Sequence, residues 1–433
     1  MKQTIIKSLS AENFASFADK VTFSTQVDLS KKGDMANTFF AGDTSYNKVS
    51  FLYGANGSGK TFFCKILREI QRIIDWSPLT AMSNNSQLLS LPQLKGIDSS
   101  VAKFAFDTQY AQKPTTFVIE LIIDGTTFHY EFSIDGKKIV YELLTKKNMR
   151  TEKLLERKSP SYKDIELRSG LKSFESNKHS VKEEALCLAV AALLNNEMAS
   201  SVIFAIKGIQ VVNMTAANLS PIEGRTAFSE ERLAKYVRIL QKADPTIRKM
   251  NITFEEKELA RQKFETDDFE NREFIAKNTT VAVESKHAVY DSGKETSQAA
   301  ISFFSDESLG TVKLFTALPY LFEVLDTGGV LVVDEIENGL HLSLVKEIVS
   351  LFTNEETNPH RAQLICTSHQ PLLLDGNFRR DQVWVVRKDE FGKSTLHRIS
   401  DLKTSRAKFS LTNKILEGAF GCNPNLFFDD NIL

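Results

Sequence analysis

Eight consecutive residues, Gly54-Ala55-Asn56-Gly57-Ser58-Gly59-Lys60-Thr61, match the pattern G-x-x-x-x-G-K-[ST] without a departure. In such a loop the glycines let backbone N–H groups converge on phosphate oxygens at a helix N-terminus, where the helix dipole adds partial positive charge. Lys60 is expected to contact the β- and γ-phosphates, and the Thr61 hydroxyl is expected to coordinate Mg²⁺. The loop therefore predicts ATP and Mg²⁺ as the bound groups.

An acidic pair, Asp334-Glu335, follows the apolar run Val330-Leu331-Val332-Val333. A carboxylate at this strand end is placed to enter the Mg²⁺ shell, so Asp334 is the second expected metal ligand. Glu335 is then placed to polarise a water in line with the γ-phosphate, which is the role of a general base. Taken alone, such a pair is a solvated strand end, but the phosphate loop upstream favours a hydrolytic site.

His369 lies just past the apolar run Gln363-Leu364-Ile365-Cys366-Thr367. A histidine at the end of a sheet strand can bond the γ-phosphate and so respond to its presence. The alternative is a structural histidine with satisfied hydrogen bonds. The position after a strand favours the functional interpretation, and His369 is a candidate catalytic residue together with Glu335.

Ser308 and Gly310 stand at the start of a predicted helix, shortly before the acidic strand. They offer a hydroxyl and an unshielded backbone amide at a helix N-terminus, which is a second, separate place for an anion. A plain N-cap is the alternative, because Ser, Gly and Thr all suit one.

Elements of an α/β sheet must position these residues. The buried run Val49–Tyr53 predicts a strand that leads through the glycine loop into an apolar-periodic helix. In the C-terminal third we expect a helix at about 309–325, a helix near 343–352, and three strands. These strands are Val330–Asp334, Gln363–Thr367 and Gln382–Val386. Apolar strands that end in polar residues place ligand groups at the carboxyl edge of an open sheet.

Three consecutive regions are expected. Residues 1–150 form an N-terminal lobe with the phosphate loop and a β-meander, because Asp124-Gly125 and Asp135-Gly136 separate alternating runs. Residues 151–300 form a mainly helical insertion, which begins with a Lys-, Arg- and Ser-rich stretch at 150–183 that is expected to be an exposed, mobile connection. Residues 301–433 form the C-terminal lobe.

Composition fits a globular chain of 433 residues, with 42% hydrophobic and 25% charged residues. The formal net charge of −1 gives no bulk attraction to nucleic acid or acidic membranes. The four cysteines contain no C-x-x-C pair, and no apolar run approaches the length of a membrane span. A cytoplasmic location without a membrane partner is expected.

In this order the four elements resemble the ABC-type ATPase heads of the SMC and OLD-nuclease superfamily. Ser308-Leu309-Gly310-Thr311 looks like the signature loop of that family, Asn338-Gly339-Leu340-His341 like its D-loop, and His369 like its switch histidine. Other stretches are similar to ATPases of bacterial anti-phage systems, such as OLD-like abortive-infection ATPases and the ATPase subunit of PARIS. These stretches include Asn13-Phe14, Ser16-Phe17 and Arg379-Arg380-Asp381-Gln382-Val383-Trp384. The resemblance implies a P-loop NTPase of ABC/SMC-head type, with a β-meander and a helical insertion between the phosphate loop and the signature loop.

Two departures from the family pattern stand out. The Gln-containing loop that senses Mg²⁺ in many such heads has no clear match among Gln87, Gln93 and Gln109. The residues after His369 are too few for the nuclease domain of OLD proteins, so any nuclease chemistry is expected on another polypeptide.

The resemblance also implies a head-to-tail homodimer or larger assembly. ATP would lie between Lys60 of one copy and Ser308 and Gly310 of another, with two sites in a twofold pair. The expected function is a sensor or scaffold ATPase of an anti-phage system that controls a separate effector, a nuclease or toxin. Alternatives are a DNA-repair or chromosome-maintenance ATPase that clamps duplex DNA through the basic segment 146–182, a transporter motor, and a non-hydrolysing ATP-gated module.

Overall fold

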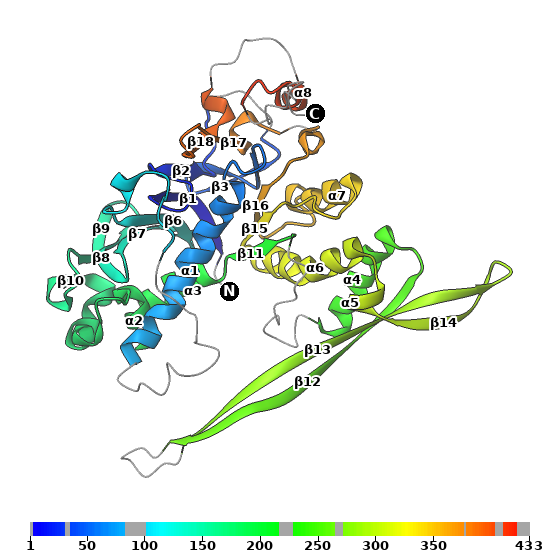
Figure 1. The fold of residues 1–433 in the computed structure, drawn as a ribbon, viewed down its shortest axis with the longest axis horizontal. Coiled ribbons are helices and arrows are strands. Elements are labelled where there is room, and N and C mark those ends of the chain that lie inside the picture. The colour runs from blue at the N-terminus through cyan, green and yellow to red at the C-terminus, as the bar shows by residue number, and fades with distance from the viewer. Residues whose placement is uncertain are drawn as a thin grey trace. The chain divides into compact units, whose positions relative to one another are not determined.

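The computed structural model describes residues 3–30, 35–82, 101–215, 228–264, 272–375, 378–402 and 410–421. The chain divides into two compact units (Figure 1). Unit 1 comprises Met1–Asn213, Val324–Glu337 and Val345–Leu433, and unit 2 comprises Met214–Glu323 and Asn338–Leu344. The units therefore interleave along the sequence, which differs from the three consecutive regions expected.

A six-stranded sheet in unit 1 carries the phosphate loop. Its order is β11-β15-β16-β5-β17-β18, and all neighbouring pairs are parallel except β17 with β18. Strands β5, β15 and β16 are buried along their whole length, as expected for parallel strands covered on both faces. The bounds are β5 Val49–Tyr53, β11 Gln210–Asn213, β15 Val330–Asp334, β16 Gln363–Thr367, β17 Val383–Lys388 and β18 Ser394–Arg398.

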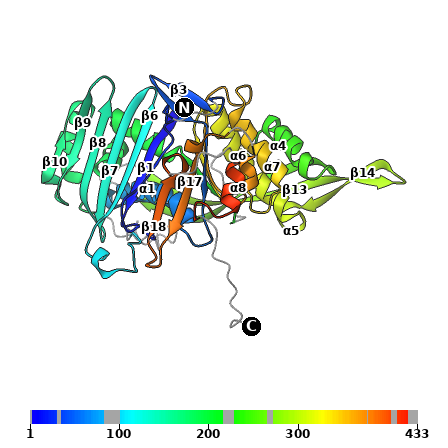
Figure 2. The ribbon, with the colours of Figure 1, turned by 90° about the horizontal axis from the view of Figure 1, so that it is seen from above.

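A second sheet of unit 1 is antiparallel and seven-stranded, in the order β10-β9-β8-β7-β6-β1-β2 (Figure 2). Asp124 (φ 47°) and Gly125 (φ 79°) both have positive φ, as a two-residue hairpin turn requires. The predicted β-meander is present as β6, β7 and β8. The bounds are β1 Thr4–Glu12, β2 Val21–Ser24, β6 Thr115–Ile123, β7 Thr126–Asp135, β8 Lys138–Lys147, β9 Thr151–Arg157 and β10 Ile165–Leu167.

Helix α1 (Lys60–Met82) joins the two sheets of unit 1 through one apolar core. Its buried side chains recur at helical spacing, from Phe63 to Ile74, and they cluster with residues of both sheets. Helices α2 (Cys187–Leu193) and α3 (Glu197–Lys207) contribute to the same core. Among the described residues no single helix is long and apolar enough to cross a membrane. Helices α2 and α3 meet these two criteria only when they are taken together, and they are bent by 108° relative to each other.

The stretch 150–183 is built into the antiparallel sheet, so the expected exposed connection is wrong. It supplies β9, β10 and two short 3-10 helices, η3 (Tyr162–Asp164) and η4 (Ser169–Ser180). Leu154, Leu155 and Arg157 are fully buried. The Arg157 guanidinium donates to several backbone carbonyls, including that of Ala185 at 2.7 Å, which satisfies its polar atoms inside the core.

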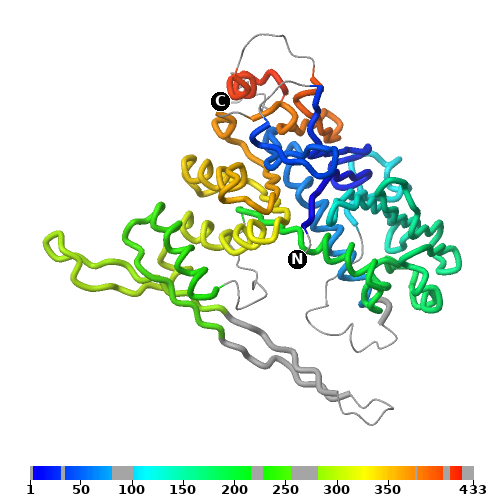
Figure 3. Tube along the Cα trace, turned by 180° about the vertical axis from the view of Figure 1, so that it is seen from behind, coloured from blue at the N-terminus to red at the C-terminus, as the bar shows by residue number. Residues whose placement is uncertain are grey.

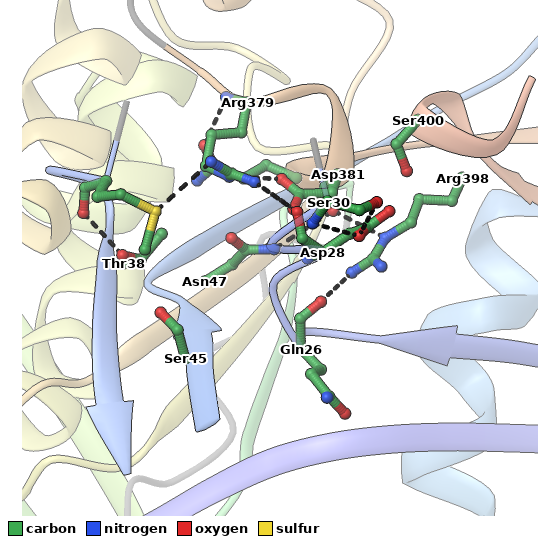
Figure 4. Close-up of polar contacts among 12 residues, drawn as sticks. Gln26, Asp28, Ser30, Thr38, Ser45, Asn47, Arg379, Asp381, Arg398 and Ser400 are labelled. Carbon is green, nitrogen blue, oxygen red and sulfur yellow. Dashed lines mark hydrogen bonds and ion pairs between the residues drawn. The ribbon is translucent and has the colours of Figure 1, made fainter. Parts of the chain in front are cut away.

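A buried ion pair fastens the segment before β17 to the N-terminal region (Figure 4). The carboxylate of Asp381 accepts hydrogen bonds from Arg379 Nε and Nη2, both at 2.9 Å, and from the backbone N–H of Asp28 at 2.8 Å. Arg379 Nη2 also donates to the Asp28 carbonyl. The stretch 379–384 noted in the sequence thus has a structural role.

The remaining elements of unit 1 are short connections apart from one helix. They are β3 Thr38–Ala41, β4 Thr44–Asn47, η2 Thr108–Tyr110, α7 Leu342–Thr353, η6 Pro371–Leu374, η7 Arg380–Gln382, η8 Ile399–Asp401 and α8 Leu411–Leu416, with the first residues of α7 assigned to unit 2.

Unit 2 combines helices with a three-stranded antiparallel sheet, β12-β13-β14 (Figure 3). The long pair β12 (Ile247–Phe264) and β13 (Arg272–Asp291) is followed by β14 (Lys294–Ser302). The helices are α4 (Glu230–Ala243), α5 (Phe303–Asp306) and α6 (Leu309–Thr327), whose last turn belongs to unit 1. Residues 151–300 are therefore not mainly helical, although they include α4, which Ser229 caps by accepting from Arg232 N at 3.4 Å.

Candidate active site

The glycine loop between β5 and α1 is packed so tightly that two of its glycines cannot carry a side chain. A Cβ at Gly54 would lie 2.6 Å from the carbonyl oxygen of Val386. Gly59 has φ +115°, and a Cβ there would lie 2.8 Å from both Ser16 Oγ and Ser394 Oγ. The loop backbone is thus held close to β17, with its last residue at the start of a 23-residue helix.

Two serines from distant parts of the chain support this loop. Ser394 Oγ donates to the carbonyl oxygen of Ser58 at 2.6 Å and lies 2.8 Å from Ser16 Oγ. Ser394 N donates to the Ser16 carbonyl at 2.7 Å. The N-terminal stretch Asn13 to Phe17, noted only as a resemblance, therefore braces the loop from outside. Ser394 lies in no local motif that would mark it as a support of this loop.

Lys60 and Ser58 hold polar atoms inside the loop. The Lys60 ammonium is buried and donates to the carbonyls of Gly54 at 2.8 Å and Ala55 at 3.1 Å. The Ser58 hydroxyl is buried and has no hydrogen-bond partner among the residues that the structure describes. A cation and an unpartnered hydroxyl in a glycine cradle at a helix N-terminus fit a phosphate group.

Asp334 and Glu335 follow β15, and their positions are fixed by Thr367 at the end of β16. The Thr367 hydroxyl donates to Asp334 Oδ1 at 2.7 Å and accepts from the backbone N–H of Glu335 at 2.7 Å. Glu335 has φ 53°, in the left-handed region that non-glycine residues rarely adopt. This conformation turns the chain sharply after Asp334, and a single buried hydroxyl sets both acidic residues.

His369 lies beside Glu335, with 3.9 Å between its Nε2 and Glu335 Oε1. The backbone N–H of His369 donates to Glu337 Oε1. Burial, and next the positive charge of Lys60, lower the pKa of His369 below its usual value. The imidazole is therefore neutral at neutral pH, with one nitrogen that donates and one that accepts.

One cavity of about 630 Å³ collects most of the expected residues of unit 1. Asp334 is buried and is not among the residues that line it. The lining residues are Asn56, Gly57, Gly59, Lys60, Thr61, Phe62, Glu335 and His369. The cavity thus joins a phosphate-type cradle, a hydroxyl, a carboxylate and an imidazole. The lining offers the Thr61 hydroxyl, and Asp334, which directly precedes the lining residue Glu335, offers a carboxylate; both are hard oxygen ligands of the kind that Mg²⁺ prefers.

The expected signature segment, residues 308–311, belongs to unit 2, and none of its residues is among those that line this cavity. Ser308 Oγ accepts from the backbone N–H of Thr311 at 3.1 Å, so it caps α6. Gly310 lies against the segment at 338–341, because a Cβ on Gly310 would lie 2.5 Å from the Gly339 carbonyl oxygen. Lys313 Nζ donates to Asn338 Oδ1 and so holds the two segments together.

Three positions that support the site were not predicted: Ser394, Thr367 and Glu337. Thr367 and Glu337 each had a usable signal, since Thr367 is the one polar residue that ends an apolar strand before Ser368-His369, and Glu337 lies two residues after Glu335. Of the Gln-loop candidates, Gln109 lies in η2 and donates hydrogen bonds to the carboxylate of Asp107, the residue that precedes this helix. Gln87 and Gln93 lie outside the described residues.

A family model described as "AAA domain, putative AbiEii toxin, Type IV TA system" matches residues 49–188 and 216–375, more than half of the chain. No curated protein sequence matches the chain. The solved structures that are similar to it include two heads of SMC proteins. One is the SMC head bound to the C-terminal winged-helix domain of ScpA, with 15% identity, a TM-score of 0.43, and coverage of 90% of this chain and 97% of the other. The second is the SMC head domain from Thermotoga maritima, with 11% identity, a TM-score of 0.36, and coverage of 92% and 99%.

Proposed function

The chain belongs to this AAA-domain family, with an α/β P-loop NTPase fold, and we propose that it is a Mg²⁺-dependent ATPase whose nucleotide sites are completed by a second copy of the chain. The observation that carries the proposal is one cavity of unit 1. In it Lys60 and Thr61 of the phosphate loop share one space with Glu335 and His369. Binding groups for a triphosphate and a candidate base for its hydrolysis therefore face the same ligand.

Binding of the triphosphate uses the loop and the first turn of α1. Backbone N–H groups of the loop and the helix dipole attract phosphate oxygens, and the Lys60 ammonium neutralises charge at the β- and γ-phosphates. Lys60 exchanges its bonds to the Gly54 and Ala55 carbonyls for phosphate oxygens. Thr61 and Asp334 would hold Mg²⁺, which when bound neutralises developing charge on the phosphate oxygens.

Glu335 orients and deprotonates the attacking water in this proposal. The left-handed backbone conformation of Glu335 and the hydrogen bond from its N–H to Thr367 set the direction of its side chain. This direction differs from that of a residue that continues the strand. The neutral His369 imidazole, 3.9 Å from the Glu335 carboxylate, donates a hydrogen bond toward the γ-phosphate. Removal of the γ-phosphate then removes the partner of this bond.

Pairing of two copies rests on the signature segment. Ser308 and Gly310 of a second copy would contact the γ-phosphate held by Lys60 of the first, in a twofold arrangement with two such sites. The exposed Leu309 (59% exposed) stands between them, and its apolar side chain would be covered in such a pair. ATP then links the copies, and hydrolysis releases them.

We further propose that this cycle serves as the sensor or scaffold of an anti-phage system that controls a separate nuclease or toxin. The support is the family description, which refers to a toxin of Type IV TA systems. The basic segment at 146–182 does not support the alternative function of a duplex-DNA clamp. Several of its lysines pair with glutamates, as in Lys146–Glu152 at 3.0 Å and Lys153–Glu156 at 2.7 Å.

Two substitutions test the ATPase. Lys60→Ala should abolish ATP binding, and Glu335→Gln should bind ATP but lower turnover about 100-fold or more. Lys172→Ala and Glu356→Gln, which change exposed residues of the same types, serve as matched controls and should behave as wild type. ATP binding by calorimetry and phosphate release provide the readouts. Unchanged affinity in Lys60→Ala, or normal turnover in Glu335→Gln, would refute the assignment.

The effector is tested with Glu335→Gln held in the ATP-bound state. This variant with ATP should retain a nuclease or toxin from the native cell extract that Lys60→Ala does not retain. Recovery of duplex DNA in its place, with salt-dependent affinity, would favour the clamp.

A further inference from the structure

A chain of hydrogen bonds in unit 2 ends at Glu307, the residue directly before the signature segment. The His287 ring on β13 stands between two carboxylates. Its Nε2 lies 2.6 Å from Glu307 Oε1, and its Nδ1 lies 3.9 Å from Asp244 Oδ2. Thr246 Oγ1 is 2.8 Å from Nδ1, and Ser285 Oγ donates to Glu307 Oε1 at 2.6 Å. Ser285 and His287 are two residues apart and therefore lie on the same face of the strand.

The donors and acceptors of this cluster fix where a proton must lie. The single hydroxyl proton of Thr246 is donated to Asp244 Oδ1 at 2.6 Å. His287 Nδ1 must therefore donate to Thr246. At Nε2 a second proton is needed, because a carboxylate oxygen and a ring nitrogen 2.6 Å apart cannot both be acceptors. A proton thus bridges His287 and Glu307.

Asp244, His287 and Glu307 are also residue types that bind metals, with ligand atoms within 4.8 Å of one another. The two carboxylates, however, face different nitrogens of one ring. A metal ion uses one ring nitrogen, and here each already has a partner within 2.8 Å. The geometry points to a proton bridge rather than a metal centre.

The bridge fixes the residue that leads into the signature segment. The Glu307 side chain is only 4% exposed, held by two bonds from β13. The next residue, Ser308, is exposed, and its hydroxyl caps the Thr311 amide. The Ser308 hydroxyl also lies 2.8 Å from the Thr311 hydroxyl, and among the described residues its side chain has no hydrogen bond to any residue of unit 2 other than Thr311. Ser308 therefore has two supports: its own bonds to the first turn of α6, and the peptide bond to Glu307, whose side chain is held by β13.

We propose that Glu307 is a positioning residue, clamped by His287 and Ser285, that holds Ser308 ready for the nucleotide of a second copy. This inference rests on the proposed function for its role in pairing. It also makes β13 part of the ATP-dependent mechanism, because a displacement of this strand at His287 would move the signature segment.

Substitutions of His287, made in the full chain that already carries Glu335→Gln, test whether His287 holds Glu307 in place or only fills space. His287→Leu removes the donor to Glu307. His287→Gln retains an amide donor at about the place of Nε2. His179→Leu is the matched control, since His179 is exposed and its ring bonds the carbonyl of Ser176, three residues earlier.

Two measurements give the expected result. Amide hydrogen exchange at residues 308–312 should become faster in His287→Leu and stay at the parental rate in His287→Gln and His179→Leu. Sedimentation should show that His287→Leu needs about tenfold more ATP for half-maximal assembly, with ATP affinity at the phosphate loop unchanged, and that His287→Gln restores assembly.

Each contrary result has a distinct meaning. Parental exchange in His287→Leu, or failure of His287→Gln to restore it, would overturn the clamp. Stoichiometric Zn²⁺ binding by the parent chain that His287→Leu abolishes would overturn the proton bridge in favour of a metal. If exchange responds as expected but the Glu335→Gln parent does not assemble with ATP, the clamp stands and the proposed pairing fails.

Discussion

Thr367 shows how a neutral side chain can set the geometry of two acidic ones. Its buried hydroxyl bonds the Asp334 carboxylate and the Glu335 backbone at once. Thr367→Val keeps the shape of the side chain and removes both bonds. We expect turnover to fall about 10- to 100-fold with little change in ATP affinity, because two hydrogen bonds are lost and each contributes about 0.5–1.5 kcal/mol. Thr367→Ser should retain most of the turnover.

Single-turnover hydrolysis at saturating ATP measures this effect. Turnover of Thr367→Val equal to that of wild type would show that Asp334 and Glu335 need no such support.

His129 gives a pH dependence of stability that is separate from the active site. Hydrogen bonds that the ring donates to Glu120, and next to Glu131, raise the pKa of His129 to about 9. A raised pKa means that the folded state holds the proton more tightly, so the stabilisation is complete below about pH 6.5 and is lost as the pH rises through about 9. Because the ring is partly exposed, we expect a loss of about 1 kcal/mol.

Urea unfolding of wild type and His129→Gln at several pH values tests this contribution. The stability difference between the two should shrink as the pH rises from about 6.5 to about 9. A constant difference would contradict it.

Site residues that belong to a local sequence motif were predicted, whereas most of those that only the fold brings together were not. The pattern from Gly54 to Thr61 and the strand that ends at Asp334 identify most of the cavity lining. Ser394 and Ser16 support the same loop from positions 378 residues apart, a relation that no local pattern contains. The bridge from His287 to Glu307 likewise needs the fold of unit 2 to bring its members together.

At the scale of elements, the buried parallel strands followed their sequence pattern closely. Val330–Asp334 and Gln363–Thr367 were predicted with the bounds that the structure has, because both faces of each strand are covered and the apolar run is continuous. Strands β12 and β13 were missed. Their charged residues at 254–277 show no apolar periodicity that a sequence argument could use.

The ion pair of Arg379 and Asp381 predicts how firmly the segment before β17 is anchored. Asp381→Asn would leave the Arg379 guanidinium, which is 3% exposed, without its counter-charge. We expect a loss of about 3–5 kcal/mol in the free energy of unfolding, because a buried charge without a partner is costly. Asp401→Asn, an exposed change nearby in the sequence, is the control.

Denaturant unfolding measures this loss. An unfolding midpoint of Asp381→Asn equal to that of Asp401→Asn would show that the buried pair adds nothing to the anchor.

At the scale of the whole molecule, the proposed functional residues are divided between the two units. Unit 1 holds the cavity, and unit 2 holds the signature segment, the D-loop-like segment at 338–341 and the sheet with His287. The chain enters and leaves unit 2 on either side of β15, so the acidic strand of the site is covalently adjacent to both segments of unit 2. In the proposed ATPase cycle, this covalent adjacency is the route by which a change at β15 would act on unit 2.

Complementation between two inactive variants tests the central claim, that each site takes Lys60 from one copy and Ser308 from another. Lys60→Ala and Ser308→Arg should each be inactive alone. In a mixed pair, one site carries both substitutions and the other carries neither. We predict that an equal mixture regains about a quarter of wild-type ATP turnover, since half of the pairs are mixed and each keeps one of its two sites. A mixture that stays inactive, or a Ser308→Arg variant with normal turnover alone, would contradict the shared site.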